Sequence, residues 1–155
     1  MSITYRIANP DDFQTITEIY SFMVSSEENV GEDTHEEIAD MARLVLMNPD
    51  KAAIFLAFDG DNAIGFSRVR IRHEWFFSDR DDPFGYLEAI YVRREYRRGG
   101  IAHTLVAMCE DFSRERGCLE FFSGCDLDNE GSYGFHIGAG FKEQHRIIHF
   151  SKELC

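Results

Sequence analysis

The stretch "RREYRRGGIAHTL", residues 93–105, has residue types and a spacing that could bind an anion. Four arginines fall within six residues, and two adjacent glycines, Gly99 and Gly100, follow them. An apolar pattern with the spacing of one helix face comes next, formed by Ile101, Leu105, Met108, Cys109 and Phe112. The sequence therefore predicts that the arginines and glycines form the entrance to a helix.

A helix start of this kind lacks the usual acceptors for its backbone amides. Ser, Thr, Asp or Asn normally caps the first turn, and acidic residues are preferred there over basic ones. We expect the amides of residues 100–103 to converge on one point, an arrangement that binds phosphate. Glycine lets a ligand approach the backbone closely, and Arg97 and Arg98 could add charge-assisted hydrogen bonds. The alternative is a solvated basic turn.

The elements around this loop alternate between strands and helices. The loop joins a predicted strand, "YLEAIYV", to a helix over about residues 100–116, and the strand "CLEFFSG" follows. Two strands joined by such a helix should be parallel, with a right-handed crossover. The other predicted elements are strands at 3–8, 52–58 and 63–73, helices at 9–24, 33–47 and 127–141, and a last strand or pair at 142–154. Because no linker divides the chain, we expect a single domain over residues 1–155.

Composition narrows the class of partner. The chain has 155 residues, a formal net charge of -12 and a sequence pI near 4.8. An acidic chain disfavours nucleic acid, whose phosphates need a broad basic surface, and favours a small cationic molecule. Neither a signal peptide nor an apolar stretch of membrane-spanning length is recognisable. We therefore expect a soluble, cytoplasmic protein with no membrane partner.

The cysteines do not have the spacing of a metal site. None of the four forms a CxxC pair, and Cys109 falls on the apolar face of the helix after the loop. We interpret the cysteines as reduced thiols that fill space rather than as ligands. The sequence thus predicts no metal.

The arginine-glycine loop also resembles a known family. "Arg97-Arg98-Gly99-Gly100-Ile101-Ala102" matches the R/Q-x-x-G-x-G/A signature of the GNAT N-acetyltransferases, at the same place between the fourth strand and the third helix. The order of elements is similar along nearly the whole chain. The resemblance implies an α/β GNAT fold, with a mixed central sheet of six to seven strands flanked by about four helices.

The resemblance further implies acetyl-CoA as co-substrate. Its pyrophosphate would lie on the loop amides, its pantetheine arm would follow "AIYV", and the amide of Ile90 would face the thioester carbonyl. Asn129 occupies a position from which the family often contacts the coenzyme arm, although it could equally cap a helix. The implied coenzyme-binding residues are Ile90, Tyr91, Val92, Arg97, Arg98, Gly99, Gly100, Ile101, Ala102, His103 and Asn129.

The second half of the chain has a narrower resemblance. "GYLEAIYVRREYRRGGIA" and "LEFFSGCDLDNEGSYGFHIGAGFKEQHRIIHFSKEL" are similar to the aminoglycoside 6'-N-acetyltransferases, in which "LEGIFV", an "N…H…GF" helix and an "ERVxxFxK" ending recur. The chain departs from that pattern at Ala89, where the subgroup often has Gly, and at Gly131 and Gly134 inside the helix.

Glu88 and His136 are the residues best suited to move protons in acetyl transfer. Glu88 should alternate with Ile90 and Val92 on one face of the strand, so its carboxylate could hold an ammonium group and accept its proton. The alternative is a half-exposed strand glutamate. His136 lies where many GNAT enzymes have a tyrosine that protonates the departing thiolate, and Tyr133 is the reserve candidate.

Acidic residues in two loops could contact a cationic acceptor. "SDRDDP" places Asp79, Asp81 and Asp82 before the strand that carries Glu88, and "SSEEN" places Glu27 after the first helix. Such runs usually form solvated surface. In GNAT enzymes, however, these loops build the acceptor site, so the resemblance implies that Glu27, the three aspartates and Glu88 bind substrate.

The sequence thus predicts transfer of an acetyl group from acetyl-CoA to a primary amine, with the 6'-amine of an aminoglycoside as the expected acceptor. A polyamine, an amino acid or a protein amine is the first alternative. A CoA-binding regulatory domain without turnover is the second, although such a domain would need neither Glu88 nor His136. A homodimer is compatible with this prediction.

Overall fold

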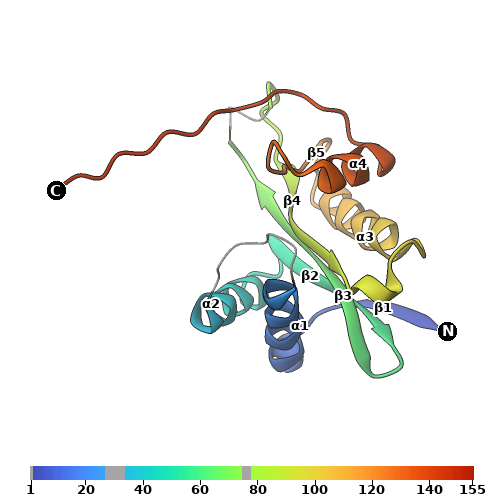
Figure 1. Cartoon of the computed structure of the whole chain (residues 1–155). Coiled ribbons are helices and arrows are strands. Elements are labelled where there is room, and N and C mark those ends of the chain that lie inside the picture. Colours follow the sequence, from blue (N-terminus) through green and yellow to red (C-terminus); the bar gives the residue numbers. More distant parts are fainter. Residues whose placement is uncertain (1, 27–33, 75–77) are drawn as a thin grey trace. The chain divides into compact units, whose positions relative to one another are not determined.

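A computed structural model of the chain describes residues 2–26, 34–74 and 78–155. These residues form two compact units, Met1–Ser123 and Gly124–Cys155, which are described in turn. Figure 1 labels the helices and strands of both.

The first unit is built on a mixed five-stranded sheet in the order β1-β2-β3-β4-β5. The pairs β1–β2, β2–β3 and β3–β4 are antiparallel, and β5 is parallel to β4. A helix, α3 (Ile101–Glu115), connects β4 to β5, as the sequence predicts for a parallel crossover. The strands are β1 Ile3–Ile7, β2 Ala52–Asp59, β3 Asn62–Arg72, β4 Phe84–Val92 and β5 Phe121–Phe122.

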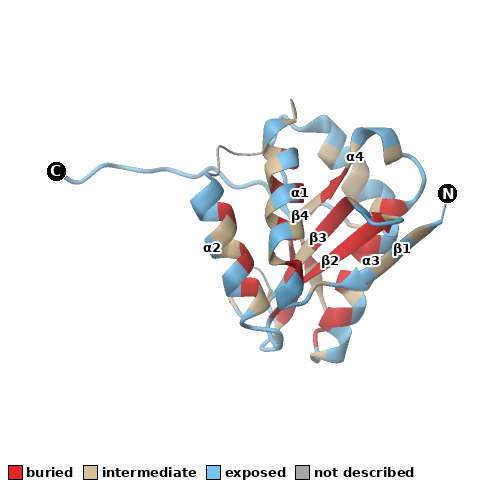
Figure 2. Ribbon diagram, turned by 90° about the horizontal axis from the view of Figure 1, so that it is seen from below, coloured by how far each residue is buried: buried red, intermediate tan, exposed pale blue. Residues whose placement is uncertain are grey.

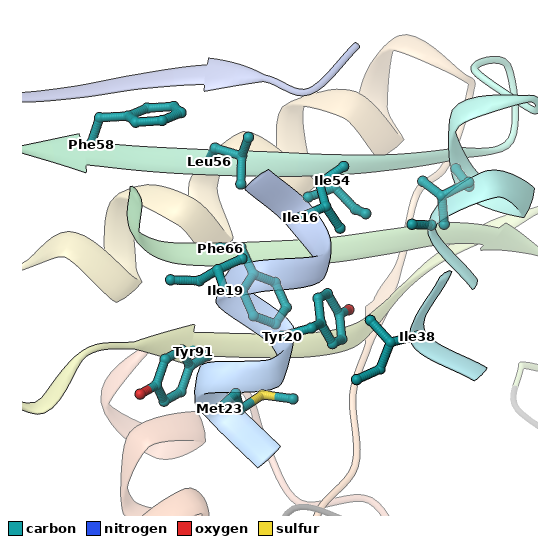
Figure 3. Packing of buried hydrophobic residues seen from close by; sticks show 13 residues of the cluster. Ile16, Ile19, Tyr20, Met23, Ile38, Ile54, Leu56, Phe58, Phe66 and Tyr91 are labelled. Atoms are coloured by element: carbon teal, nitrogen blue, oxygen red, sulfur yellow. The ribbon is translucent and has the colours of Figure 1, made fainter. Parts of the chain in front are cut away.

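Helices cover both faces of this sheet. Figure 3 shows α1 side chains such as Tyr20 against the face of β3 that carries Phe66, and α2 contributes Ile38 to the same cluster. On the other face, the hydroxyl of Ser67 in β3 donates to the carbonyl oxygen of Leu105 in α3. Because helices cover both its faces, β2 is buried along nearly all of its length (Figure 2). These helices are α1 Phe13–Ser25, α2 His35–Leu46 and α3 Ile101–Glu115, with short 3-10 turns η1 Pro10–Asp12 and η2 Arg94–Tyr96.

The chain enters α1 through a capping arrangement that the sequence predicts in part. Asn9 caps the turn and Pro10 occupies its first position, as expected. The structure adds Asp12, which accepts from the Asn9 amide at 2.8 Å and from both terminal nitrogens of Arg6 at 2.7 Å. This carboxylate therefore ties β1 to the start of α1.

The second unit contains α4, Glu130–Gly138, followed by an irregular segment that reaches the C-terminus. The four α-helices of the described residues agree with the predicted number. Within those residues, no helix is both long and apolar enough to cross a membrane.

The prediction of six to seven strands is wrong, because the described residues form five. The expected strand at 118–124 is reduced to Phe121–Phe122. The expected strand or pair at 142–154 is irregular and exposed, with Phe150 and Leu154 each 91% accessible (Figure 2). Its residues favour a strand, but a strand also needs a neighbouring ladder of hydrogen bonds, which sequence propensity does not supply.

Candidate functional site: the arginine-glycine loop and strand β4

The loop between β4 and α3 ends in a left-handed glycine at the start of the helix. Gly100 is the N-cap of α3, with a φ of 83° and no side-chain hydrogen bond to the first turn. A β-carbon on Gly100 would meet nothing within 4 Å, so glycine is favoured there by its left-handed backbone rather than by lack of space. The first amides of α3 have no intrahelical acceptor, and Gly99 and Gly100 before them are exposed.

Side chains from the loop fix its position on the sheet. The Nε of Arg97 donates to the carbonyl oxygen of Val92 at 2.7 Å, and the hydroxyl of Tyr96 donates to Asp59 at 2.8 Å. Arg98 has a φ of 65°, an uncommon left-handed value for a residue other than glycine, and its side chain is exposed. The predicted phosphate contacts thus have different surroundings, because Arg97 also supports the loop and Arg98 points to solvent.

Strand β4 leaves part of one edge open. It pairs with β3 over almost its whole length, but with β5 only at Gly85 and Tyr86. From Leu87 to Val92, no strand of the described residues pairs with this edge. Ladder hydrogen bonds alternate along a strand, and the Arg93 amide donates to Ile64 of β3, so the backbone groups of Ile90 and Val92 face this open edge. They lie where an extended ligand arm that leads to the loop could bind, although the Val92 carbonyl oxygen already accepts from Arg97.

A β-bulge in β4 changes the predicted direction of Glu88. Arg68 of β3 is opposite Ala89 and Val69 is opposite Leu87, so Glu88 is an extra residue between two consecutive pairs. Cross-strand partners share a face of the sheet, and Ile90 pairs with Ser67, whose hydroxyl contacts α3. Ile90 therefore lies on the α3 face.

Glu88 instead lies on the α1 and α2 face, where it meets Arg68 and Arg70. The expectation that Glu88 and Ile90 alternate on one face is therefore wrong. The bulge is the reason, because its extra residue shifts the alternation of side chains between Glu88 and Ile90 by one position.

Two arginines of β3 flank the carboxylate of Glu88. Arg68 Nη2 lies 3.8 Å from Oε2, and Arg70 Nε lies 3.4 Å from Oε1. The side chains of Glu88 and Arg68 are 17% and 18% exposed, whereas that of Arg70 is 57% exposed. Sequence reasoning missed both arginines, although "SRVRIR" places them two residues apart, which is the spacing of one strand face.

The structure describes only part of the acidic loop that the sequence analysis assigns to the acceptor site. Asp79, Asp81 and Asp82 are exposed, and none of their carboxylates forms an ion pair with the described residues. The loop is held by Arg80, which pairs with Glu120 at 3.4 Å, and by the hydrogen bond of Ser78 to the same carboxylate. Glu27 lies outside the described residues.

Helix α4 of the second unit carries Asn129, His136 and Tyr133. The side chain of Asn129 caps α4 by accepting from the Ser132 amide at 3.0 Å, which confirms its structural interpretation. His136 Nδ1 lies 2.6 Å from the Ser132 carbonyl oxygen. Because a carbonyl oxygen only accepts, this contact requires the tautomer with a proton on Nδ1.

The hydroxyl of Tyr133 donates to Glu143 at 2.9 Å. This hydrogen bond to a carboxylate raises the pKa of Tyr133 above its ordinary value. Tyr133 is therefore a weaker acid than a free tyrosine.

The sequence profile of the acetyltransferase (GNAT) family matches residues 13–141. The chain belongs to this family. It is 35% identical over 122 residues to an aminoglycoside N(6')-acetyltransferase type 1 of Acinetobacter genomosp. 13, which covers 77% of this chain and 83% of the relative. A relative of the same description from Klebsiella aerogenes is 34% identical over 79% of this chain and 80% of its own length.

Solved structures with the same fold belong to similar enzymes. The aminoglycoside 6'-N-acetyltransferase AAC(6')-Ih from Acinetobacter baumannii is 26% identical and superposes with a TM-score of 0.85 over 99% of both chains. AAC(6')-Iy in complex with the bisubstrate analog CoA-S-monomethyl-acetylneamine is 25% identical, with a TM-score of 0.84 over 99% of this chain and 100% of that one. This GNAT chain is thus similar to acetyltransferases of one substrate class.

Proposed function

We propose that this GNAT chain transfers the acetyl group of acetyl-CoA to the 6'-amine of an aminoglycoside through a direct ternary complex. The observation that carries the proposal is the uncapped start of α3 beside the open edge of β4. Together they offer a site for a pyrophosphate and for an extended arm. The relatives named for this reaction support the choice of acceptor.

The coenzyme side of the proposed reaction rests on backbone groups. The amides of Gly99, Gly100, Ile101, Ala102 and His103 would bind the pyrophosphate, with Arg98 adding charge from the exposed loop. Along the open edge, Tyr91 and Val92 would bind the pantetheine arm. The Ile90 amide would donate to the thioester oxygen as negative charge develops on it.

Glu88 is the proposed partner of the acceptor amine. Its carboxylate has no hydrogen bond to the described residues, since both arginine contacts exceed ordinary hydrogen-bond length. It can therefore accept from an ammonium group and take its proton, directly or through water. Asp79, Asp81, Asp82 and Glu27 remain proposed contacts for the other cationic groups of the acceptor.

His136 is the proposed acid that returns a proton to the thiolate. Its Nδ1–H donates to the Ser132 carbonyl, which orients the ring, and Nε2 is the nitrogen proposed to transfer the proton. Asn129 is proposed to contact the coenzyme arm through atoms that its capping bond does not use. The prediction that residues 1–155 act as one domain stays a prediction.

The experiment that tests the function is thiol release from acetyl-CoA across a panel of acceptors. We expect turnover with kanamycin-type aminoglycosides that carry a 6'-amine, and none with analogues that have a 6'-hydroxyl. Equal turnover of both would exclude 6' transfer. Turnover with polyamines, amino acids or peptides alone would move the assignment to those acceptors, and coenzyme binding without turnover on any acceptor would indicate a regulatory domain.

We also propose a homodimer in the cytoplasm. Within the segment 142–154, the apolar side chains Ile147, Ile148, Phe150 and Leu154 are 54% to 91% exposed. So many exposed apolar groups in one segment favour burial against another surface, and a second copy is the proposed partner. Light scattering should show a dimer for the full chain and a monomer for an Ile148→Ser, Phe150→Ser variant. A monomeric wild type would exclude the dimer.

A further inference from the structure

Strand β3 presents three arginines to the α1 and α2 face of the sheet. Arg68, Arg70 and Arg72 occupy alternate positions, so their side chains leave the strand on the same side. Arg72 is neutralised locally, because its Nε and Nη2 each donate to Glu74 at 2.6 Å. Arg68 and Arg70 have a different environment.

In the described part of the chain, Glu88 is the one carboxylate paired with Arg68 or Arg70. Two guanidinium groups thus pair with a single carboxylate. Arg72 also interacts with Glu88, and Glu74 with Arg70, but these two opposite charges cancel, so the five groups have one net positive charge. The chain as a whole has a net charge of -12. The surroundings of Glu88 therefore have the opposite sign to the rest of the protein.

Because Arg68 is largely buried, water screens its positive charge only weakly. The side chain of Arg68 is 18% exposed, and its Nε is buried without a hydrogen-bond partner among the described residues. The guanidinium lies 5.9 Å from the centre of the Tyr20 ring, so an aromatic face occupies part of its surroundings. A charge with little water around it is screened less than an exposed one.

We propose that Arg68 and Arg70 determine acceptor specificity at Glu88. This inference rests on the proposed function, in which Glu88 holds the 6'-ammonium group. One ammonium group is favoured by the carboxylate, whereas a second one on the same sugar ring is repelled by the guanidinium groups. The site therefore prefers an acceptor whose 6'-aminated ring carries a hydroxyl, rather than another amine, at the 2' carbon.

The test compares two aminoglycosides that share a 6'-amine and differ only in a 2'-hydroxyl or a 2'-amine. The quantity measured is the ratio of their kcat/KM values, because any general damage to Glu88 cancels in it. Arg70→Gln is the main variant, since Arg70 is more than half exposed and its loss should be tolerated in the fold. We expect its ratio to shift toward the 2'-amine by about 3- to 10-fold, as Coulomb's law predicts for charges several ångströms apart near a surface.

Three controls separate charge from structure. Arg70→Lys keeps the charge and should keep the wild-type ratio. Arg114→Gln removes the same charge from α3, where Arg114 pairs with Asp111 at 2.9 Å, and should also leave the ratio unchanged. High salt should reduce the shift in Arg70→Gln, because exposed charges are screened beyond about 8 Å at physiological ionic strength.

The outcomes distinguish this inference from the function on which it rests. If Arg70→Gln and Arg68→Gln lower kcat/KM equally for both acceptors, the arginines only position Glu88 and the specificity inference is wrong. If the wild type acetylates neither acceptor, the proposed function is wrong and the inference fails with it. A wild-type preference for the 2'-hydroxyl that Arg70→Gln reduces and Arg70→Lys preserves supports it.

Discussion

The Nε of Arg97 lies 2.7 Å from the carbonyl oxygen of Val92, so the last residue of β4 accepts a hydrogen bond from the loop that follows it. Arg97 also lies over the Tyr91 ring, with 5.7 Å between the guanidinium carbon and the ring centre. Both contacts hold the loop against the end of the strand. The Arg97 side chain therefore fixes the position of the loop in addition to contributing a positive charge.

Replacing Arg97 by Ala should loosen this loop as well as remove a charge. We expect about 1 kcal/mol lower stability, the usual contribution of one hydrogen bond, and weaker CoA binding by about 10-fold. Arg98→Ala is the matched control, because it removes the same charge from an exposed side chain and should leave stability unchanged. Calorimetric titration with CoA and thermal unfolding measure the two effects. Equal stability loss in both variants would contradict the supporting role of Arg97.

Gly100 permits a prediction with a close internal control. Gly100 and Gly117 stand at opposite ends of α3, with φ values of 83° and 82°, and a β-carbon at either would meet nothing within 4 Å. Alanine at each position should cost about 1–2 kcal/mol through backbone strain alone. Only Gly100→Ala should also weaken CoA binding, because only Gly100 shapes the amides of the first turn. Similar CoA affinities in the two variants would remove the loop from the coenzyme site.

Glu88→Gln keeps the shape of the side chain and removes its charge and its basicity. Turnover should fall by about 100-fold or more, since general-base assistance is typically of that size. CoA affinity should survive, because the proposed coenzyme contacts are backbone groups of the loop and of the open strand edge. Steady-state kinetics and calorimetry provide the two readouts. Wild-type turnover would reduce Glu88 to a partner of Arg68 and Arg70.

Local features of the sequence predicted the loop well, because they depend on neighbours along the chain. The helix entrance at Gly100 follows from glycine placement, and the burial of Cys109 follows from helical spacing. The GNAT motif likewise lies within one short stretch. These predictions did not require knowledge of which strands pair.

The face of the sheet on which Glu88 lies depends on how β3 and β4 pair, and it could not be predicted from neighbouring residues along the chain. The bulge is a mismatch between β3 and β4, so neither strand shows it alone. The contacts of Arg68 and Arg70 with Glu88 also depend on the pairing of β3 with β4. The segment 142–154 illustrates the same limit, since its residues favour a strand but its structure depends on a pairing partner.

His136 and Tyr133 can be separated by kinetics. His136→Ala should lower kcat by at least about 100-fold if Nε2 supplies the proton to the thiolate, and should change KM for the acceptor much less. Tyr133→Phe should leave kcat close to wild type, because the Tyr133 hydroxyl is donated to Glu143 and its pKa is raised. A large loss in Tyr133→Phe with little loss in His136→Ala would reverse the assignment.

Asp12 gives a prediction about stability and pH. Its carboxylate accepts from Arg6 and from the Asn9 amide, and the hydrogen bonds from Arg6 are the largest cause of its lowered pKa. Asp12→Asn places an amide group against a guanidinium donor. Because the Arg6 side chain is 48% exposed, we expect a loss of about 2 kcal/mol at neutral pH, the usual contribution of a hydrogen bond to a charged group. Asp11→Asn, at an exposed neighbouring position, is the control and should change stability little.

The pH dependence of that difference has a defined sign. A carboxyl group with a lowered pKa in the folded state contributes its full stability above the ordinary Asp pKa of about 3.9, and loses it as pH falls through the folded value. The stability gap between wild type and Asp12→Asn should therefore be constant near neutrality and shrink in acid. Urea unfolding at a series of pH values measures it. A gap that persists unchanged into strong acid would show that Asp12 acts by shape and packing rather than by its charge.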